Sequence, residues 1–149
     1  MQFDHERLKK YREKCGLNKE KAMEQLDIER RTLNLYESGR GLPGSLAIAK
    51  MAQLYGVSMR ELLGDTEPGK LFPPGKLRFT WDPLREKRET EHKTWAQICE
   101  MCQYSPRSYN SFNLNHTFKK SPHIGTLIWV SEHLNIPIED FFVAEDGAA

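Results

Sequence analysis

The sequence contains the same pattern twice, and this repeat constrains the fold more than any other feature. The first copy begins at Leu8 and the second at Leu84, and their first parts align at a constant offset of 76 residues. The later parts align at an offset of 79, because the loop NLNHTFKKSP of the second copy is three residues longer. An insertion in a loop costs little. The repeat therefore predicts two copies of one supersecondary module.

The matched positions agree in chemical kind, and the apolar ones do so throughout. At the offset of 76 the matches are Leu8 with Leu84, Arg12 with Arg88, Ala22 with Ile98, Glu24 with Glu100, Leu26 with Cys102, Arg31 with Arg107 and Tyr36 with Phe112. At the offset of 79 they are Pro43 with Pro122, Ile48 with Leu127, Met51 with Val130, Val57 with Ile136, and Leu62 and Leu63 with Phe141 and Phe142. We expect both copies to build the same kind of core.

A Pro- and Gly-rich stretch, GDTEPGKLFPPGKLRF, separates the two copies. It contains Pro68, Pro73 and Pro74 and has no helical periodicity, which is typical of a linker. The sequence thus predicts a first domain over residues 1–65, a linker over 66–80, a second and divergent domain over 81–144, and a tail over 145–149.

Capping signals predict helices in both copies. Asp4 can cap a first helix, Asn18 opens a second and a third begins near Glu29. Further start signals are the capping boxes of Ser58 with Glu61 and Thr94 with Gln97, and the Ser105 and Pro106 pair. No segment alternates convincingly like a strand. The predicted fold class is therefore all-α, with two tandem five-helix domains.

Two segments of the first copy carry a resemblance to a known family. They are LKKYREKCGLNKEKAMEQLDIERRTLNLYESGRGLP and LAIAKMAQLYGVSMRELL. In order and spacing, Leu8 to Leu63 resembles the Cro and lambda-repressor helix-turn-helix family, also called Xre-type. Residues 84–142 resemble the same family more loosely. The resemblance implies two short helices joined by a tight turn, of which the second reads DNA in the major groove.

A recognition helix must present polar side chains on one face while its other face holds the core. We expect Ile28, Leu33 and Tyr36 to be the inner residues of the third helix. The outward residues are then Glu29, Arg30, Arg31 and Asn34. Arginine can read guanine, and asparagine adenine, through two hydrogen bonds each. The alternative for Arg30 and Arg31 is that they are solvated surface charges.

Two further residues, Lys19 and Arg40, are candidates for the same surface. Lys19 stands where the family often has a glutamine that contacts DNA, and the resemblance implies a phosphate or base contact there. Arg40, in the loop after the third helix, can contact phosphate. Glu29 is repelled by phosphates unless it reads a cytosine amino group, or it can favour the helix N-terminus electrostatically.

The resemblance also implies a structural pair. An arginine of the family's first helix commonly pairs with a glutamate at the end of the third, and Arg12 and Glu37 occupy those positions. The second copy keeps the arginine as Arg88 but has Asn113 in place of the acid.

The second copy differs from the first where DNA contact is concerned. Trp95 stands in place of Lys19, and residues 81–149 carry seven Lys and Arg against ten Asp and Glu. This negative charge opposes approach to a polyanion. Residues that can still contact bases or phosphates are Arg107, Ser108, Asn110, Ser111, Lys119 and Lys120. The alternative is a retained scaffold used for dimerisation or for binding a partner.

Cys99 and Cys102 form a C-x-x-C pair that invites a metal or redox interpretation. They align with Met23 and Leu26 on the apolar face of the second helix, and the chain has no second such pair. Packing is therefore the favoured interpretation, since zinc sites of this kind usually need two pairs. We expect no metal, no cofactor and no catalytic residues, hence no enzyme.

The sequence also bears on location. The N-terminus is charged from residue 4 onward, and no apolar run approaches the ~18 residues of a membrane span. Three widely spread cysteines argue against a disulfide framework. We expect a protein of the reducing cytoplasm with no membrane contact.

Two functional hypotheses follow. In the first, the chain is a sequence-specific regulator, a repressor, that binds double-stranded DNA through tandem helix-turn-helix modules. In the second, it is an antitoxin- or antirepressor-like interaction module whose second domain binds another protein or forms a homodimer.

Overall fold

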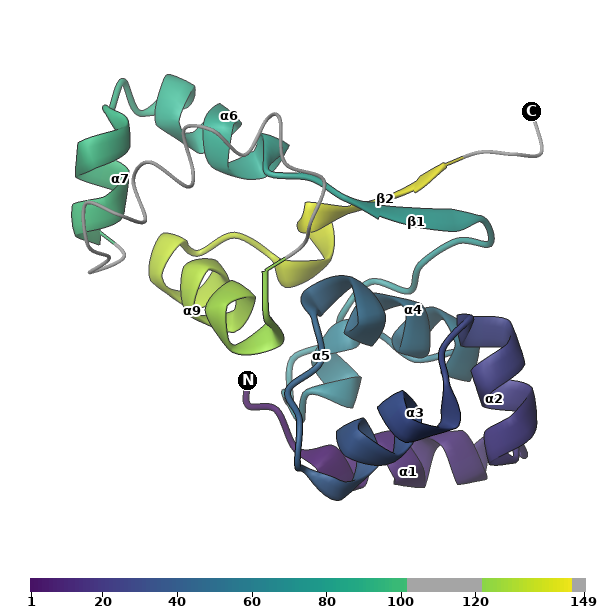
Figure 1. The fold of residues 1–149 in the computed structure, drawn as a ribbon. Helices are drawn as coiled ribbons and strands as arrows, with labels where there is room; N and C mark the ends of the chain where they lie inside the picture. The colour runs from purple at the N-terminus through teal and green to yellow at the C-terminus, as the bar shows by residue number, and fades with distance from the viewer. Residues whose placement is uncertain (102–121, 146–149) are drawn as a thin grey trace.

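The structure of the chain is a computed structural model that describes residues 1–101 and 122–145. Its first half consists of five helices (Figure 1). They are α1 (His5–Lys14), α2 (Lys19–Leu26), α3 (Arg30–Ser38), α4 (Ser45–Tyr55) and α5 (Met59–Leu62). The predicted caps are confirmed at three of these helices. Asp4 accepts from the amide of Glu6, Asn18 from that of Lys21 and Ser58 from that of Glu61.

The apolar face of each helix packs into a shared core. Leu8 of α1, Ala22 of α2, Leu33 of α3 and Ile48 of α4 are almost completely buried. These residues lie three or four positions from other apolar residues of the same helix, which is the spacing that places them on one face. The core fixes α2 and α3 against α1 and α4, and so positions their outer faces.

The prediction of an all-α fold is wrong in one respect, because the described residues include two strands. β1 (Lys76–Phe79) pairs antiparallel with β2 (Phe142–Glu145), and Leu77 lies opposite Ala144. Within β1, Leu77 is buried between exposed Lys76 and Arg78. Four residues are too few for this alternation to stand out in the sequence, and the partner strand lies far along the chain.

β1 also lies inside the segment predicted as a linker, residues 66–80. This segment runs along α4 instead of standing free: the side-chain amide of Gln53 donates to the carbonyl oxygens of Pro73 and Gly75 at 2.7 and 2.9 Å. Leu77 is 2% exposed and joins the buried apolar cluster that spans both halves of the chain. The predicted domain boundaries themselves remain a prediction.

The described part of the second half is again mainly helical. Its elements are α6 (Asp82–Thr90), α7 (Trp95–Met101), α9 (Ile124–Leu134) and the 3₁₀ helix η1 (Ile138–Phe141). The predicted capping box of α7 is confirmed, because Thr94 and Gln97 exchange both of its hydrogen bonds at 2.8 and 3.2 Å. Phe79, Trp81, Phe141 and Phe142 pack their rings against one another beside the sheet. Ser105 and Pro106 lie outside the described residues.

Several described elements recur at the spacings of the sequence repeat. α4 and α9 have eleven residues each and begin at Ser45 and Ile124, which are 79 positions apart. Each helix is followed by a left-handed residue, Gly56 (φ 73°) after α4 and Asn135 (φ 54°) after α9. That the two halves are copies of one module remains a prediction, because residues 102–121 are outside the described part.

Candidate nucleic-acid interface

The turn between α2 and α3 sets the angle between the two helices. Asp27, the residue that follows α2, adopts the left-handed conformation (φ 54°), and the Ile28 amide donates to the Met23 carbonyl at 3.1 Å. Glu29 then precedes α3 as its N-cap residue but makes no side-chain capping bond. Asp tolerates the left-handed region better than most residues, so the turn can be this tight without glycine.

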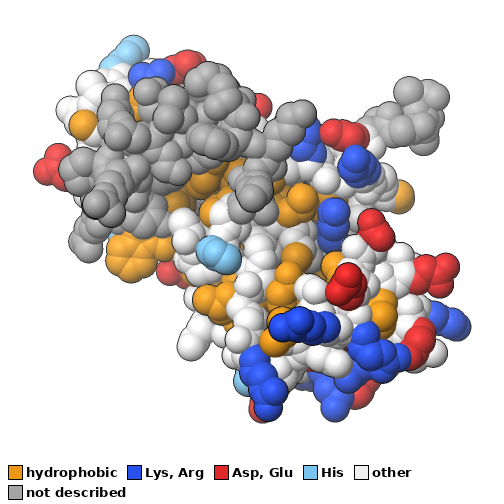
Figure 2. Space-filling view, viewed as in Figure 1, with side chains coloured by type: hydrophobic (Ala, Val, Ile, Leu, Met, Phe, Trp, Pro, Cys, Tyr) orange, Lys and Arg blue, Asp and Glu red, His pale blue; other side chains and the backbone are white. Residues whose placement is uncertain are grey.

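The inner and outer faces of α3 are arranged as the sequence predicts. Leu33 is fully buried, and Ile28 and Tyr36 are half-buried against the core. On the other side, Glu29, Arg30, Arg31, Asn34 and Arg40 are exposed, while Lys19 at the start of α2 is half-buried. Figure 2 shows Lys and Arg side chains gathered over the part of the molecule that holds α1 to α3, with acidic side chains between them.

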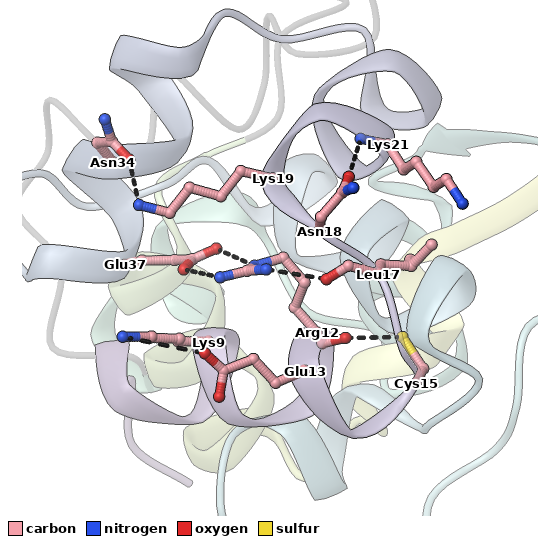
Figure 3. A network of polar contacts seen from close by, with 10 residues as sticks. All are labelled: Lys9, Arg12, Glu13, Cys15, Leu17, Asn18, Lys19, Lys21, Asn34 and Glu37. Atoms are coloured by element: carbon pink, nitrogen blue, oxygen red, sulfur yellow. Dashed lines mark hydrogen bonds and ion pairs between the residues drawn. The ribbon is translucent and has the colours of Figure 1, made fainter.

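Two of the predicted contact residues touch each other. The Lys19 ammonium donates to Asn34 Oδ1 at 2.9 Å, across the gap between α2 and α3 (Figure 3). This bond leaves the two N–H donors of the Asn34 amide free to turn outward, and Oδ1 keeps a second lone pair. Lys19 therefore orients the amide that a base contact would use.

Arg30 has a partner that the sequence did not indicate. It forms an ion pair with Glu20 of α2, and both side chains are more than half exposed. No local signal could have shown this pair, because it depends on the angle at which α2 and α3 cross. An exposed pair of this kind contributes only about 0–1 kcal/mol, so Arg30 can exchange Glu20 for another anion at small cost.

Arg12 and Glu37 hold α1 and α3 together beneath this surface. Arg12 donates to the two carboxylate oxygens of Glu37 at 2.9 and 3.1 Å and to the Leu17 carbonyl at 2.9 Å (Figure 3). Both residues are buried. The hydrogen bond to Glu37 raises the pKa of Arg12, against the opposing effect of burial. The pair fixes α3, and through α3 the position of the outward residues.

The comparison with protein families agrees with this geometry. Residues 8–62 match the family model described as helix-turn-helix. Residues 8–62 are thus similar to a helix-turn-helix domain in sequence, and α1 to α5 lie within or next to them. The resemblance to the Cro and lambda-repressor family is thereby confirmed for this part of the chain. A comparison with curated proteins finds no match.

The helix-turn-helix match does not extend to the second half, whose predicted contact residues are untested. Arg107, Ser108, Asn110, Ser111, Lys119 and Lys120 all lie outside the described residues, as does Asn113. Trp95, the residue in place of Lys19, is half-buried on α7, and its ring faces the guanidinium of Arg88 at 5.0 Å. This position is therefore used for packing.

Two further observations concern residues 1–101 and 122–145. None of the helices there has the length and apolarity needed to cross a bilayer. The described residues also bring no group of three or more His, Cys, Asp or Glu side chains together in a way that could hold a metal ion. Cys102 lies outside this part of the chain.

Proposed function

We propose that the chain is a sequence-specific DNA-binding transcription regulator whose helix-turn-helix domain contacts duplex DNA through α2 and α3. One observation carries this proposal: the polar residues of both helices, including the Lys19 and Asn34 pair, share an outward side of a helix-turn-helix domain. The helix-turn-helix is a DNA-reading unit whose second helix enters the major groove.

The side chains divide into base readers and phosphate contacts. Arg31 reads guanine and Asn34 reads adenine, because these two side chains match the hydrogen-bonding edges of those bases. Lys19 orients Asn34 and reaches a phosphate with its remaining donors, and Arg40 contacts a phosphate from the loop after α3. Arg30 joins them when it releases Glu20, and Glu29 lies at the N-terminus of α3, where a negative charge is favoured.

The regulatory role we assign is repression in the cytoplasm. A protein that occupies an operator blocks transcription without needing a contact to the polymerase. The second half contributes less to DNA binding than the first, since it is acidic and has Trp95 in place of a lysine. The alternative is that the second half binds a protein partner. The following experiment distinguishes this alternative from DNA binding.

The experiment is selection of binding sites from random duplex DNA with the intact chain, followed by affinity measurements over a range of salt concentrations. We expect log Kd to depend linearly on log salt, and each lost phosphate contact to reduce the slope by about 0.9. Lys19→Ala and Arg40→Ala should each do so. Lys76→Ala removes the same charge from β1, which lies beyond α4 from α3 (Figure 1), and should leave the slope unchanged.

Two results would count against the proposal. Binding that does not change between low and physiological salt would exclude phosphate contacts. Failure to enrich any sequence from the random pool would exclude specific reading and favour the protein-interaction alternative.

A further inference from the structure

A short contact joins the two halves of the chain at the N-termini of α4 and α9. The Ser45 amide donates to the Pro122 carbonyl at 2.8 Å, and the Ile124 amide donates to the Pro43 carbonyl at 3.2 Å. Between these two bonds, Gly44 and His123 face each other as an antiparallel bridge. We call these six residues, 43–45 and 122–124, the junction.

The junction is symmetric at the offset of the sequence repeat. Pro122 stands 79 positions after Pro43, and Ile124 stands 79 positions after Ser45. Exchanging each residue for its counterpart in the other half therefore converts one hydrogen bond into the other. Reciprocal contacts, in which one residue touches a second and the counterparts touch in return, are the mark of a two-fold interface between like units. Here both units belong to one chain.

Further contacts surround the junction. α9 packs on α4, and η1 packs on α5, which are again elements at matching positions. Arg60 of α5 lies 3.5 Å from the carboxylate of Glu139 in η1, whose side chain is 2% exposed. The chain passes over this pair at Gly69, where a Cβ atom would lie only 2.4 Å from Glu139 Oε1. The side of the first domain made by α5 and the start of α4 is thus covered by the chain's own second half.

The covered side leaves the outward residues of α2 and α3 accessible. Arg31, Asn34 and Arg40 are exposed while the junction is formed. α9 packs on α4, and Figure 1 shows it on the opposite side of the first domain from α2. A tethered unit has an effective concentration in the millimolar range, so a second chain at micromolar concentration competes poorly for the same face.

We propose that the chain is a single-chain counterpart of a two-fold dimer: residues 122–145 dock where a second copy would bind, and this docked single chain is the DNA-binding form. The second part of this statement rests on the proposed function. The partner of the α4 and α5 face is therefore internal, and association of two chains through that face is not needed for DNA binding.

A disulfide across the junction tests both parts. In an antiparallel bridge flanked by hydrogen bonds of this pattern, facing Cα atoms are about 4.5 Å apart, within the range that a disulfide spans. Gly44 has φ −67°, so a cysteine fits its backbone without strain. The full-length double variant Gly44→Cys with His123→Cys is oxidised, and the two single variants serve as controls for the native cysteines. Peptide mapping identifies the bond, and light scattering gives the mass.

We expect a bond between positions 44 and 123 within one chain, a mass near 17.3 kDa, and DNA affinity within about twofold of the reduced protein. Three results would overturn the proposal. They are a bond that joins two chains, free thiols at both positions after oxidation, and an oxidised protein that loses DNA affinity by more than about tenfold. A reduced protein that binds no DNA would refute the proposed function, while the position of the bond would still decide the docking.

Hydrogen exchange of the unmodified protein gives an independent measurement. Ser45 and Ile124 are the first residues of their helices, where amides have no acceptor within the helix. Their protection must therefore come from the junction. We expect both amides to exchange far more slowly than the amide of Arg30, which also begins a helix but on an exposed surface. Exchange of Ile124 as fast as that of Arg30 would show that the halves are not docked.

Discussion

Arg12 and Arg88 stand 76 positions apart and make the same local contact, but they differ in every other partner. Arg12 donates to the carbonyl of the residue five positions later, Leu17, at 2.9 Å, and Arg88 does the same to Lys93 at 3.4 Å. Arg12 is buried and paired with Glu37. The side chain of Arg88 is 31% exposed and lies over the ring of Trp95.

This difference explains why Lys19 is available for DNA contact while Trp95, at the matching position, is not. In the first half, the acid at the end of α3 compensates the buried guanidinium, so Lys19 is free to lie between the helices at the surface. In the second half, Trp95 occupies the corresponding position and provides a cation–π contact to Arg88. An indole ring carries no positive charge, so Trp95 attracts a phosphate less than the ammonium of Lys19 does.

The largest expected effect is on stability of the first half. Glu37→Ala leaves the Arg12 charge buried without its partner, which costs about 3–5 kcal/mol of unfolding free energy when burial is complete. Arg88→Ala removes a partly exposed cation–π contact and should cost about 0.5–1 kcal/mol. Urea unfolding followed by circular dichroism measures both. The control is Glu24→Ala, at an exposed acid of α2. Equal losses of unfolding free energy for Glu37→Ala and Glu24→Ala would show that the buried pair does not stabilise the first half.

The next effect concerns DNA affinity. Arg31→Ala should cost about 1–3 kcal/mol and relax specificity at one base pair, as expected for a base-reading arginine. Arg107→Ala, at the matching position of the acidic second half, should cost clearly less. Both variants are titrated with the same selected operator. Equal losses would indicate two equivalent readers, and a larger loss for Arg107→Ala would place the main reader in the second half.

A smaller effect distinguishes Tyr55 from Leu134, its counterpart at the offset of 79. The Tyr55 hydroxyl is buried with no hydrogen-bond partner among the described residues, and burial, followed by the charge of Glu37, raises its pKa. Tyr55→Phe should therefore stabilise the protein by about 1 kcal/mol. The same change at half-buried Tyr36 is the control.

The pH dependence of this variant follows from the direction of the shift. Above pH ~10 the unfolded chain loses the tyrosine proton while the folded chain keeps it. Stability of the natural protein therefore falls as the pH rises above about 10, and Tyr55→Phe should remove this part of the loss. Parallel alkaline profiles for both proteins would contradict the assignment.

An effect of similar or smaller size concerns the turns after α1 and α6, which share the same three backbone hydrogen bonds at the offset of 76. Gly16 and His92 both have positive φ, 78° and 53°. His92→Gly should stabilise the second half by about 0.5 kcal/mol, because glycine adopts this conformation without strain. Gly16→Ala should destabilise by about 1 kcal/mol through the backbone alone, since a Cβ there meets no atom within 4 Å. Thermal unfolding measures the stability of both variants. A destabilising His92→Gly together with a stabilising Gly16→Ala would show that the two turns are not equivalent.

The sequence by itself determined the local features of the chain. The caps at Asp4, Asn18, Ser58 and Thr94 are confirmed, and so is the inner position of Leu33 on α3. Each of these features depends on residues within one or two helical turns of each other. Side-chain type and spacing are enough to specify them, and this also explains why the helix-turn-helix resemblance of the first half could be seen in advance.

Only the tertiary structure decided how these elements meet. β1 pairs with a strand far along the chain, Glu20 pairs with Arg30, and Lys19 orients Asn34 because of the angle between α2 and α3. The junction is the clearest case. Its two hydrogen bonds join backbone N–H groups, which every residue other than proline provides, to backbone carbonyls, which every residue provides, so no side chain in the sequence marks them. What brings these groups together is the packing of α4 against α9.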